Sequence, residues 1–153
     1  MNIIEEKLKG MGMSLPSIPP AAGNFIPSIR SNNLVFCSGQ GPYINGKNLY
    51  LGKVGENVTE EQAYEAAKIA CLNCLAEVKQ TIGDLDKITQ IISVRGFVNG
   101  ASTFTEHPKV INGVSDLLVA LFGEKGKHVR CAIGTSLPGN IPVEVEMIVE
   151  VEA

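Results

Sequence analysis

The sequence predicts an α+β fold, in which one mixed β-sheet carries two helices on one face. Two stretches with helical spacing, 59–82 and 108–122, each follow strand-like residues and lead into another strand-like segment. The closing residues, 143–152, alternate between apolar residues and mostly glutamate, which is typical of a strand with one covered face. With 153 residues, 44% of them hydrophobic and 19% charged, the chain fits a single domain, 1–153.

The segment 1–23 is predicted to be a short helix followed by a connector. The first ten residues have amphipathic spacing, and glycines at 10 and 12 end the helix. The connector that follows contains Pro16, Pro19 and Pro20, which exclude a helix. The core of the domain is therefore expected to occupy residues 24–153.

The core is predicted to begin with strands at 25–30 and 34–38, joined by the turn-forming residues 31–33. Residues 34–37 form a continuous apolar run, which predicts a strand buried on both faces. The glycine- and asparagine-rich stretch 39–55 is expected to be a loop with a short hairpin at 43–51.

The helix at 59–82 has the clearest end signals in the chain. Thr59 followed three residues later by Gln62 predicts a capping box, and Gly83 ends the helix. A strand at 88–98 is expected next. The second helix then begins at Pro108, which suits a first helical turn, and stops before Gly123.

The last quarter is predicted to hold strands at 129–136 and 143–151 around a Pro-Gly turn at 137–140. The alternation places valines and Met147 toward the helices and the glutamates on the opposite face. Because only a turn separates the two strands, Arg130 is expected to share a face with some of those glutamates. A guanidinium can bind a carboxylate bidentately and a nearby glutamate can hold water or move a proton, although a structural salt bridge explains the same pattern.

Composition excludes several classes of protein. Thirteen Lys and Arg against sixteen Asp and Glu give a net charge of −3, which does not suit a general binder of nucleic acid or anionic membranes. No apolar run approaches about 20 residues and the N-terminus has no signal-peptide pattern, so a cytoplasmic protein is expected. The four cysteines are expected to be buried free thiols, and the distant His107 and His128 predict no metal site.

Three segments, in this order and spacing, resemble the YjgF/YER057c/UK114 family, also called the RidA family: Phe36-Cys37-Ser38-Gly39-Gln40, Arg130-Cys131-Ala132 and Pro142-Val143-Glu144-Val145-Glu146. The resemblance runs from Asn24 to Val151, and residues 1–23 are similar to a longer branch of that family. It implies a chorismate-mutase-like fold assembled as a homotrimer, with ligand sites between neighbouring subunits and no metal or organic cofactor.

The same resemblance implies an enamine/imine deaminase that hydrolyses intermediates such as 2-aminoacrylate to 2-oxo acids and ammonia. Arg130 would grip the substrate carboxylate and Glu144 would position the attacking water. The implied pocket lining consists of Ser38, Gly39, Phe25, Asn112, Cys131 and Ala132.

The sequence departs from the family pattern at two of these positions. Ala132 stands where the family commonly has a cysteine, and Phe25 stands where it often has a tyrosine. A different substrate, slower turnover or no turnover are all compatible with these changes. Two alternatives to the deaminase therefore stay open: a non-catalytic trimer that binds a small carboxylate or acts as a chaperone, and an endoribonuclease, which the net charge and the lack of a histidine pair disfavour.

Overall fold

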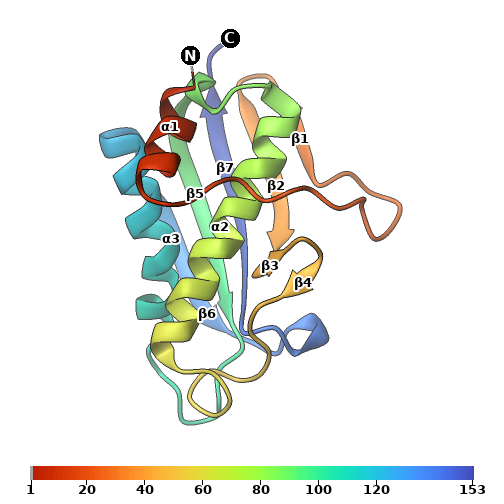
Figure 1. The fold of residues 1–153 in the computed structure, drawn as a ribbon, viewed down its shortest axis with the longest axis vertical. Helices are drawn as coiled ribbons and strands as arrows, with labels where there is room; N and C mark the ends of the chain where they lie inside the picture. Colours follow the sequence, from red (N-terminus) through yellow and green to blue (C-terminus); the bar gives the residue numbers. More distant parts are fainter. Residues whose placement is uncertain (1) are drawn as a thin grey trace.

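Three helices cover one face of a five-stranded sheet in the computed structural model, which describes residues 2–153 (Figure 1). The strand order is β1-β2-β7-β5-β6. The strands are β1 (Ser28–Ser31), β2 (Leu34–Gln40), β5 (Ile88–Val98), β6 (Val129–Gly134) and β7 (Val143–Val151). A small separate hairpin consists of β3 (Tyr43–Ile44) and β4 (Lys47–Asn48). The mixed α+β architecture predicted from the sequence is confirmed, with a third helix added to the covered face.

The long helix α2 (Glu60–Ile82) begins and ends where its sequence predicts. Thr59 Oγ1 accepts a hydrogen bond from the backbone of Gln62, and the Gln62 side chain accepts one from the backbone of Thr59. A stripe of small residues then packs into the core, where Ala63, Ala67 and Ala70 have no exposed surface. These short side chains let α2 lie close to α3 (His107–Phe122) as well as to the sheet.

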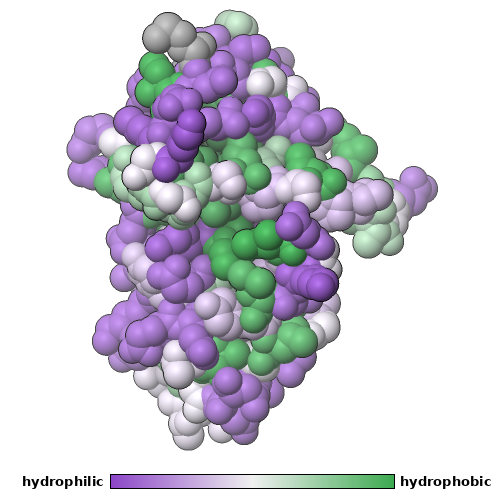
Figure 2. Space-filling model, in the orientation of Figure 1, coloured by the Kyte–Doolittle hydropathy of each residue, from purple (hydrophilic) through white to green (hydrophobic). Residues whose placement is uncertain are grey.

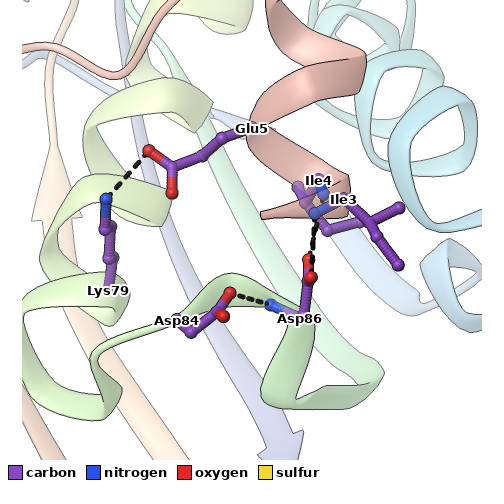
Figure 3. Close-up of polar contacts among 6 residues, drawn as sticks. All are labelled: Ile3, Ile4, Glu5, Lys79, Asp84 and Asp86. Atoms are coloured by element: carbon purple, nitrogen blue, oxygen red, sulfur yellow. Dashed lines mark hydrogen bonds and ion pairs between the residues drawn. The ribbon is translucent and has the colours of Figure 1, made fainter. Parts of the chain in front are cut away.

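The N-terminal helix α1 (Ile3–Gly10) is held at the end of the sheet by two acidic side chains (Figure 3). The Asp86 carboxylate accepts hydrogen bonds from the backbone nitrogens of Ile3 and Ile4, at 2.8 and 2.9 Å. Glu5 pairs with Lys79 of α2 at 2.8 Å. Asp86 thus satisfies two of the backbone donors that every helix N-terminus leaves free. Beyond α1, the connector crosses in front of α2 and projects past the β1 edge of the sheet (Figure 1).

The last two strands do not form the hairpin that the sequence suggests. β7 lies in the middle of the sheet, antiparallel to both β2 and β5, whereas β6 is an edge strand parallel to β5. The reason is that α3 connects β5 to β6, and a strand that follows a crossover helix returns parallel to the strand before it. The segment 137–140 is a 3₁₀ turn on the path from this edge to the centre of the sheet.

Two predictions for the first strands are also corrected. β1 begins at Ser28 instead of Phe25, after Pro27, whose carbonyl accepts a hydrogen bond from the backbone of Ser38. β2 is covered on one face only, because Val35 is buried while Phe36 is 40% exposed. The apolar run 34–37 therefore belongs to a strand with apolar residues on both faces, of which the helices cover only one.

The alternation along β7 is confirmed. Val143, Val145 and Val149 have no exposed surface and pack under the helices, while the intervening glutamates lie on the opposite face. We call this second face, which no helix covers, the open face of the sheet.

Candidate active site

The end of β2 supplies the first group of candidate residues. Its pairing with β7 is irregular between Cys37 and Gln40, so Ser38 and Gly39 form a bulge. A bulge bends a strand and turns its side chains away from the regular pattern. Gly39 is exposed and Ser38 is half-buried, which leaves this short stretch of backbone open at the sheet surface.

Glu144 packs directly against this bulge. A methyl group placed on the Gly39 Cα would lie 2.8 Å from Glu144 Oε2, so only glycine leaves room for the carboxyl group there. Glu144 is half-buried, and burial, together with the negative charge of Glu146, raises its pKa above the ordinary value of a glutamate. A carboxyl with a raised pKa holds its proton more readily than a free glutamate does, which suits it to proton transfer.

A cavity of about 330 Å³ lies beside Ser38 on the open face. Its walls combine the apolar side chains of Phe36 and Ile148 with the polar side chains of Arg95 and Glu146. Arg95 Nε and Glu146 Oε1 lie 3.4 Å apart, so these two charges largely satisfy each other. The cavity is of the size that holds a small organic molecule.

Arg130 forms the second group of candidate residues, at the edge strand β6. One terminal nitrogen of its guanidinium donates to Ser115 Oγ at 3.0 Å, and the other donates to the carbonyl of Pro108 at 3.4 Å. Both acceptors belong to α3. Asn112 lies on the same side of this helix, because it is four residues after Pro108 and three before Ser115.

A second layer of hydrogen bonds fixes Ser115. Its hydroxyl lies 2.9 Å from His128 Nε2, and His128 Nδ1 lies 2.6 Å from the carbonyl of Gly126. Since a carbonyl only accepts, the hydrogen bond to Gly126 requires a proton on His128 Nδ1. The guanidinium of Arg130 is thus held in place while staying exposed to solvent.

The neighbours of Arg130 point to alternate faces, as their positions in a strand require. Cys131 pairs with Arg95 and is exposed, which corrects the expectation that all four cysteines are buried; Cys37, Cys71 and Cys74 are. Ala132 pairs with Gly96 and is half-buried, on the same side as Arg130. No disulfide links the four thiols.

Within one chain, Arg130 and Glu144 do not share a face, and that hypothesis is wrong. Arg130 pairs with Val94, whose side chain is buried under the helices, while Glu144 pairs with Phe97 on the open face. β5 lies between their two strands. The hypothesis assumed a hairpin between β6 and β7, and it fails because β6 joins the far side of β5.

A second cavity holds one expected residue, Phe25, and one that the sequence did not suggest, Glu77. Phe25 lies in the connector, 54% exposed, at this cavity, which also contains Ser38 and Gly39. Glu77 of α2 lines this cavity. Its position in the helix places it among buried apolar neighbours. The contact between Ser115 and His128 was also not predicted, because the two residues are thirteen positions apart and meet only where α3 packs against β6.

Two further observations concern the described residues alone. Between residues 2 and 153, no three His, Cys, Asp or Glu side chains gather closely enough to hold a metal ion. Over the same range no helix combines the length and apolar character needed to cross a membrane.

Comparison with known proteins places this chain in a family. Residues 5–150 match the family described as "YjgF/chorismate mutase-like, putative endoribonuclease", which covers almost the whole chain. The chain belongs to this YjgF family, and the resemblance seen in its sequence motifs is confirmed.

Individual relatives agree with this assignment. Protein TCP17 of Trypanosoma cruzi is 33% identical over 149 residues, which span 96% of this chain and 93% of that protein. Atu1372 from Agrobacterium tumefaciens, described as of unknown function, has a sequence 41% identical to this chain. Its crystal structure superposes with a TM-score of 0.91, over 99% of this chain and 93% of that one. A "putative endoribonuclease" from Shewanella oneidensis is 37% identical, with a TM-score of 0.94 over 98% and 100% of the two chains.

Proposed function

We propose that this protein hydrolyses small 2-imino acids, such as the imine form of 2-aminoacrylate, to 2-oxo acids and ammonia. The observation that carries the proposal is the Glu144 carboxyl, half-buried against Gly39 with a raised pKa. A group of this kind can deprotonate a water molecule and return the proton to nitrogen. Membership of the YjgF family supports the same chemistry.

The reaction needs little more than an oriented water and a proton carrier, because the imine carbon is already electrophilic. Glu144 takes a proton from water as the water oxygen bonds to that carbon, and the imine nitrogen gains a proton. The resulting carbinolamine then loses ammonia, and its hydroxyl becomes the carbonyl of the 2-oxo acid. Ser38 and Gly39 would line the space in which this occurs.

Arg130 would bind the carboxylate of the substrate. Its guanidinium is exposed and is held by neutral acceptors, Ser115 Oγ and the Pro108 carbonyl, so its charge is available to an anion. Asn112, on the same side of α3, is placed to donate a further hydrogen bond to the same ligand.

The two groups would meet between two copies of the chain, as in the homotrimer that the family resemblance implies. Arg130 sits at an edge strand and Glu144 on the open face, so a neighbouring copy can lay its β6 edge beside this bulge. The open face has the surface such an assembly needs. Its exposed apolar side chains include Ile29, Phe36, Val129 and Ile133.

The test is the release of ammonia and 2-oxo acid from 2-aminoacrylate generated in situ, with the spontaneous rate subtracted. We expect Glu144→Gln to lower kcat by about 100-fold or more, as loss of a general acid–base does. Arg130→Ala should lower kcat/KM by about 10- to 100-fold through weaker carboxylate binding. The matched controls are Glu150→Gln and Arg30→Ala. Glu150 lies on the same face of β7 as Glu144, and the native Arg30 side chain donates to the backbone carbonyls of Asn32 and Glu152.

Wild-type protein that does not accelerate the reaction would contradict the proposal for this substrate. Binding of a small carboxylate that needs Arg130 but not Glu144 would instead support a non-catalytic binding protein. The family description also names endoribonuclease, so cleavage of a labelled single-stranded RNA at low salt belongs in the same experiment.

A further inference from the structure

The second cavity, of about 390 Å³, contains an acidic side chain that the proposed hydrolysis does not use. Glu77 is only 4% exposed, yet its carboxyl group borders this cavity. Among residues 2–153, no side chain donates a hydrogen bond to that carboxyl or forms an ion pair with it. Ser28 Oγ donates to the backbone carbonyl of Glu77 and not to its side chain. The lysine two residues further along α2, Lys79, pairs with Glu5 instead.

A largely enclosed carboxylate without a partner is costly, because it has lost part of its hydration and has no charge or hydrogen-bond donor in return. Burial accordingly raises the pKa of Glu77 above its ordinary value. Such a group gains most from a ligand that brings a positive charge to it. The cost is therefore removed by any cation that fits the cavity.

Three other polar side chains of the cavity, Ser38, Gln40 and Tyr43, are engaged with one another. The Tyr43 hydroxyl donates to Gln40 Oε1, and the Gln40 amide nitrogen lies 3.4 Å from Ser38 Oγ. Burial, followed by the negative charge of Glu77, raises the pKa of Tyr43 to about 12, so this phenol stays neutral. Asn73 fixes the same wall by donating to the carbonyls of Gly41 and Tyr43. Glu77 is thus the charged group left for a ligand.

The rest of the wall is apolar and comes from the connector. Pro19, Pro20, Ala21, Ala22 and Phe25 line one side of the cavity, opposite the end of β2. Figure 2, which views the helix-bearing face, shows hydrophobic residues gathered in the middle of that face beside the connector. Proline-rich backbone loses little freedom on binding, which favours a preformed site.

We propose that this cavity binds a small organic cation, a primary ammonium group on a short apolar or aromatic body. The ammonium would donate to Glu77, and the body would pack against Phe25 and the prolines of the connector. The inference stands whether or not the protein hydrolyses imines, because it uses neither Arg130 nor Glu144. Ser38 and Gly39 border both this cavity and the proposed catalytic site, so a bound cation would lie next to the reacting groups.

The test compares the binding of benzylammonium with that of benzyl alcohol, a neutral molecule of the same shape, by calorimetry at pH 8. We expect benzylammonium to bind at least tenfold more tightly, since a charge-assisted hydrogen bond is about twice as strong as a neutral one. Glu77→Gln should abolish this preference. Glu65→Gln, an exposed glutamate of the same helix, is the matched control and should keep it. Backbone amide signals of Gly39 and Gly46, both in the cavity wall, should shift on binding.

Wild-type protein that does not distinguish the two compounds, including protein that binds neither, overturns the proposal. It is also overturned if Glu77→Gln retains the preference or if the shifted signals lie away from the cavity. Should that variant fail to fold, the comparison of the two compounds on wild-type protein still decides the matter.

Discussion

Gly39 shows how one missing side chain shapes the candidate site. Its Cα lies so close to Glu144 that an added methyl group would meet the carboxyl at 2.8 Å. Glu144 has a flexible side chain, so it can move aside at little cost in stability. Gly39→Ala is therefore expected to change the position of the carboxyl and to leave the fold intact.

We predict that Gly39→Ala lowers kcat for imine hydrolysis by about 10- to 100-fold, because small displacements of a catalytic group have effects of this size. Its free energy of unfolding should change by less than about 1 kcal/mol. Steady-state kinetics and urea denaturation measure the two quantities. Gly10→Ala, where nothing lies within 4 Å, is the control. Unchanged kinetics for Gly39→Ala would show that the position of Glu144 does not matter.

Glu77 gives a prediction about stability and pH. Burial raises its pKa in the folded protein, so the unfolded chain loses this proton first as the pH rises. The stability that the protonated carboxyl contributes is complete below the unfolded pKa of about 4.3 and is lost as the pH passes the folded value. Glu77→Gln, which carries no such proton, should therefore gain stability relative to wild type between pH 4 and pH 8.

Urea denaturation of both proteins across this pH range tests the prediction. The exposed variant Glu65→Gln controls for the removal of one negative charge from α2. Parallel pH profiles for wild type and Glu77→Gln would mean that the carboxyl is better solvated than its 4% exposure indicates.

Among the elements, the contact between α2 and α3 depends on a glycine in the middle of a helix. A methyl group on Gly113 would lie 2.2 Å from the backbone carbonyl oxygen of Tyr64, which cannot move independently of α2. We expect Gly113→Ala to force the helices apart and to destabilise the protein by about 1–3 kcal/mol, although alanine favours helices. Urea denaturation measures this, and Gly10→Ala should change stability by less than about 0.5 kcal/mol. A stabilised Gly113→Ala variant would contradict the close packing.

The elements also show what the sequence can predict. The capping box at Thr59 and the alternation along β7 are local patterns, so their elements were predicted almost to the residue. The pairing of β6 is not local, because the packing of α3 against the sheet decides it. The wrong expectation that Arg130 shares a face with Glu144 followed from that pairing.

The site residues differ in the same way. Ser38, Gly39 and Glu144 lie together as neighbouring strands require, whereas the support of Arg130 by Ser115 and His128 becomes visible only in three dimensions. The helical spacing of Glu77 places it among apolar neighbours, but the cavity beside it becomes visible only in three dimensions, where the connector, β2 and the β3–β4 hairpin meet.

At the scale of the whole molecule, the open face is where another copy would bind. A continuous row of paired residues crosses all five strands on this face, from Ile29 through Phe36, Ile148 and Ser93 to Val129. Three of these side chains are between 40% and 70% exposed. Apolar rows of this length on a sheet are usually covered by a partner.

A site shared by two copies predicts that two impaired variants restore part of the activity when they are combined in one assembly. Arg130→Ala keeps Glu144, and Glu144→Gln keeps Arg130, so a mixed assembly contains some interfaces in which both intact residues face each other. With random mixing in a closed ring, about a quarter of the interfaces are intact, and co-expressed variants should recover about a quarter of wild-type activity. The control is a mixture of the two separately purified variants, combined after assembly and without exchange of subunits. It should keep only the low activity of the separate variants. Mass spectrometry verifies that the co-expressed assemblies contain both variants. If such assemblies recover no activity, Arg130 and Glu144 serve a site within one chain, or they do not act on the same substrate.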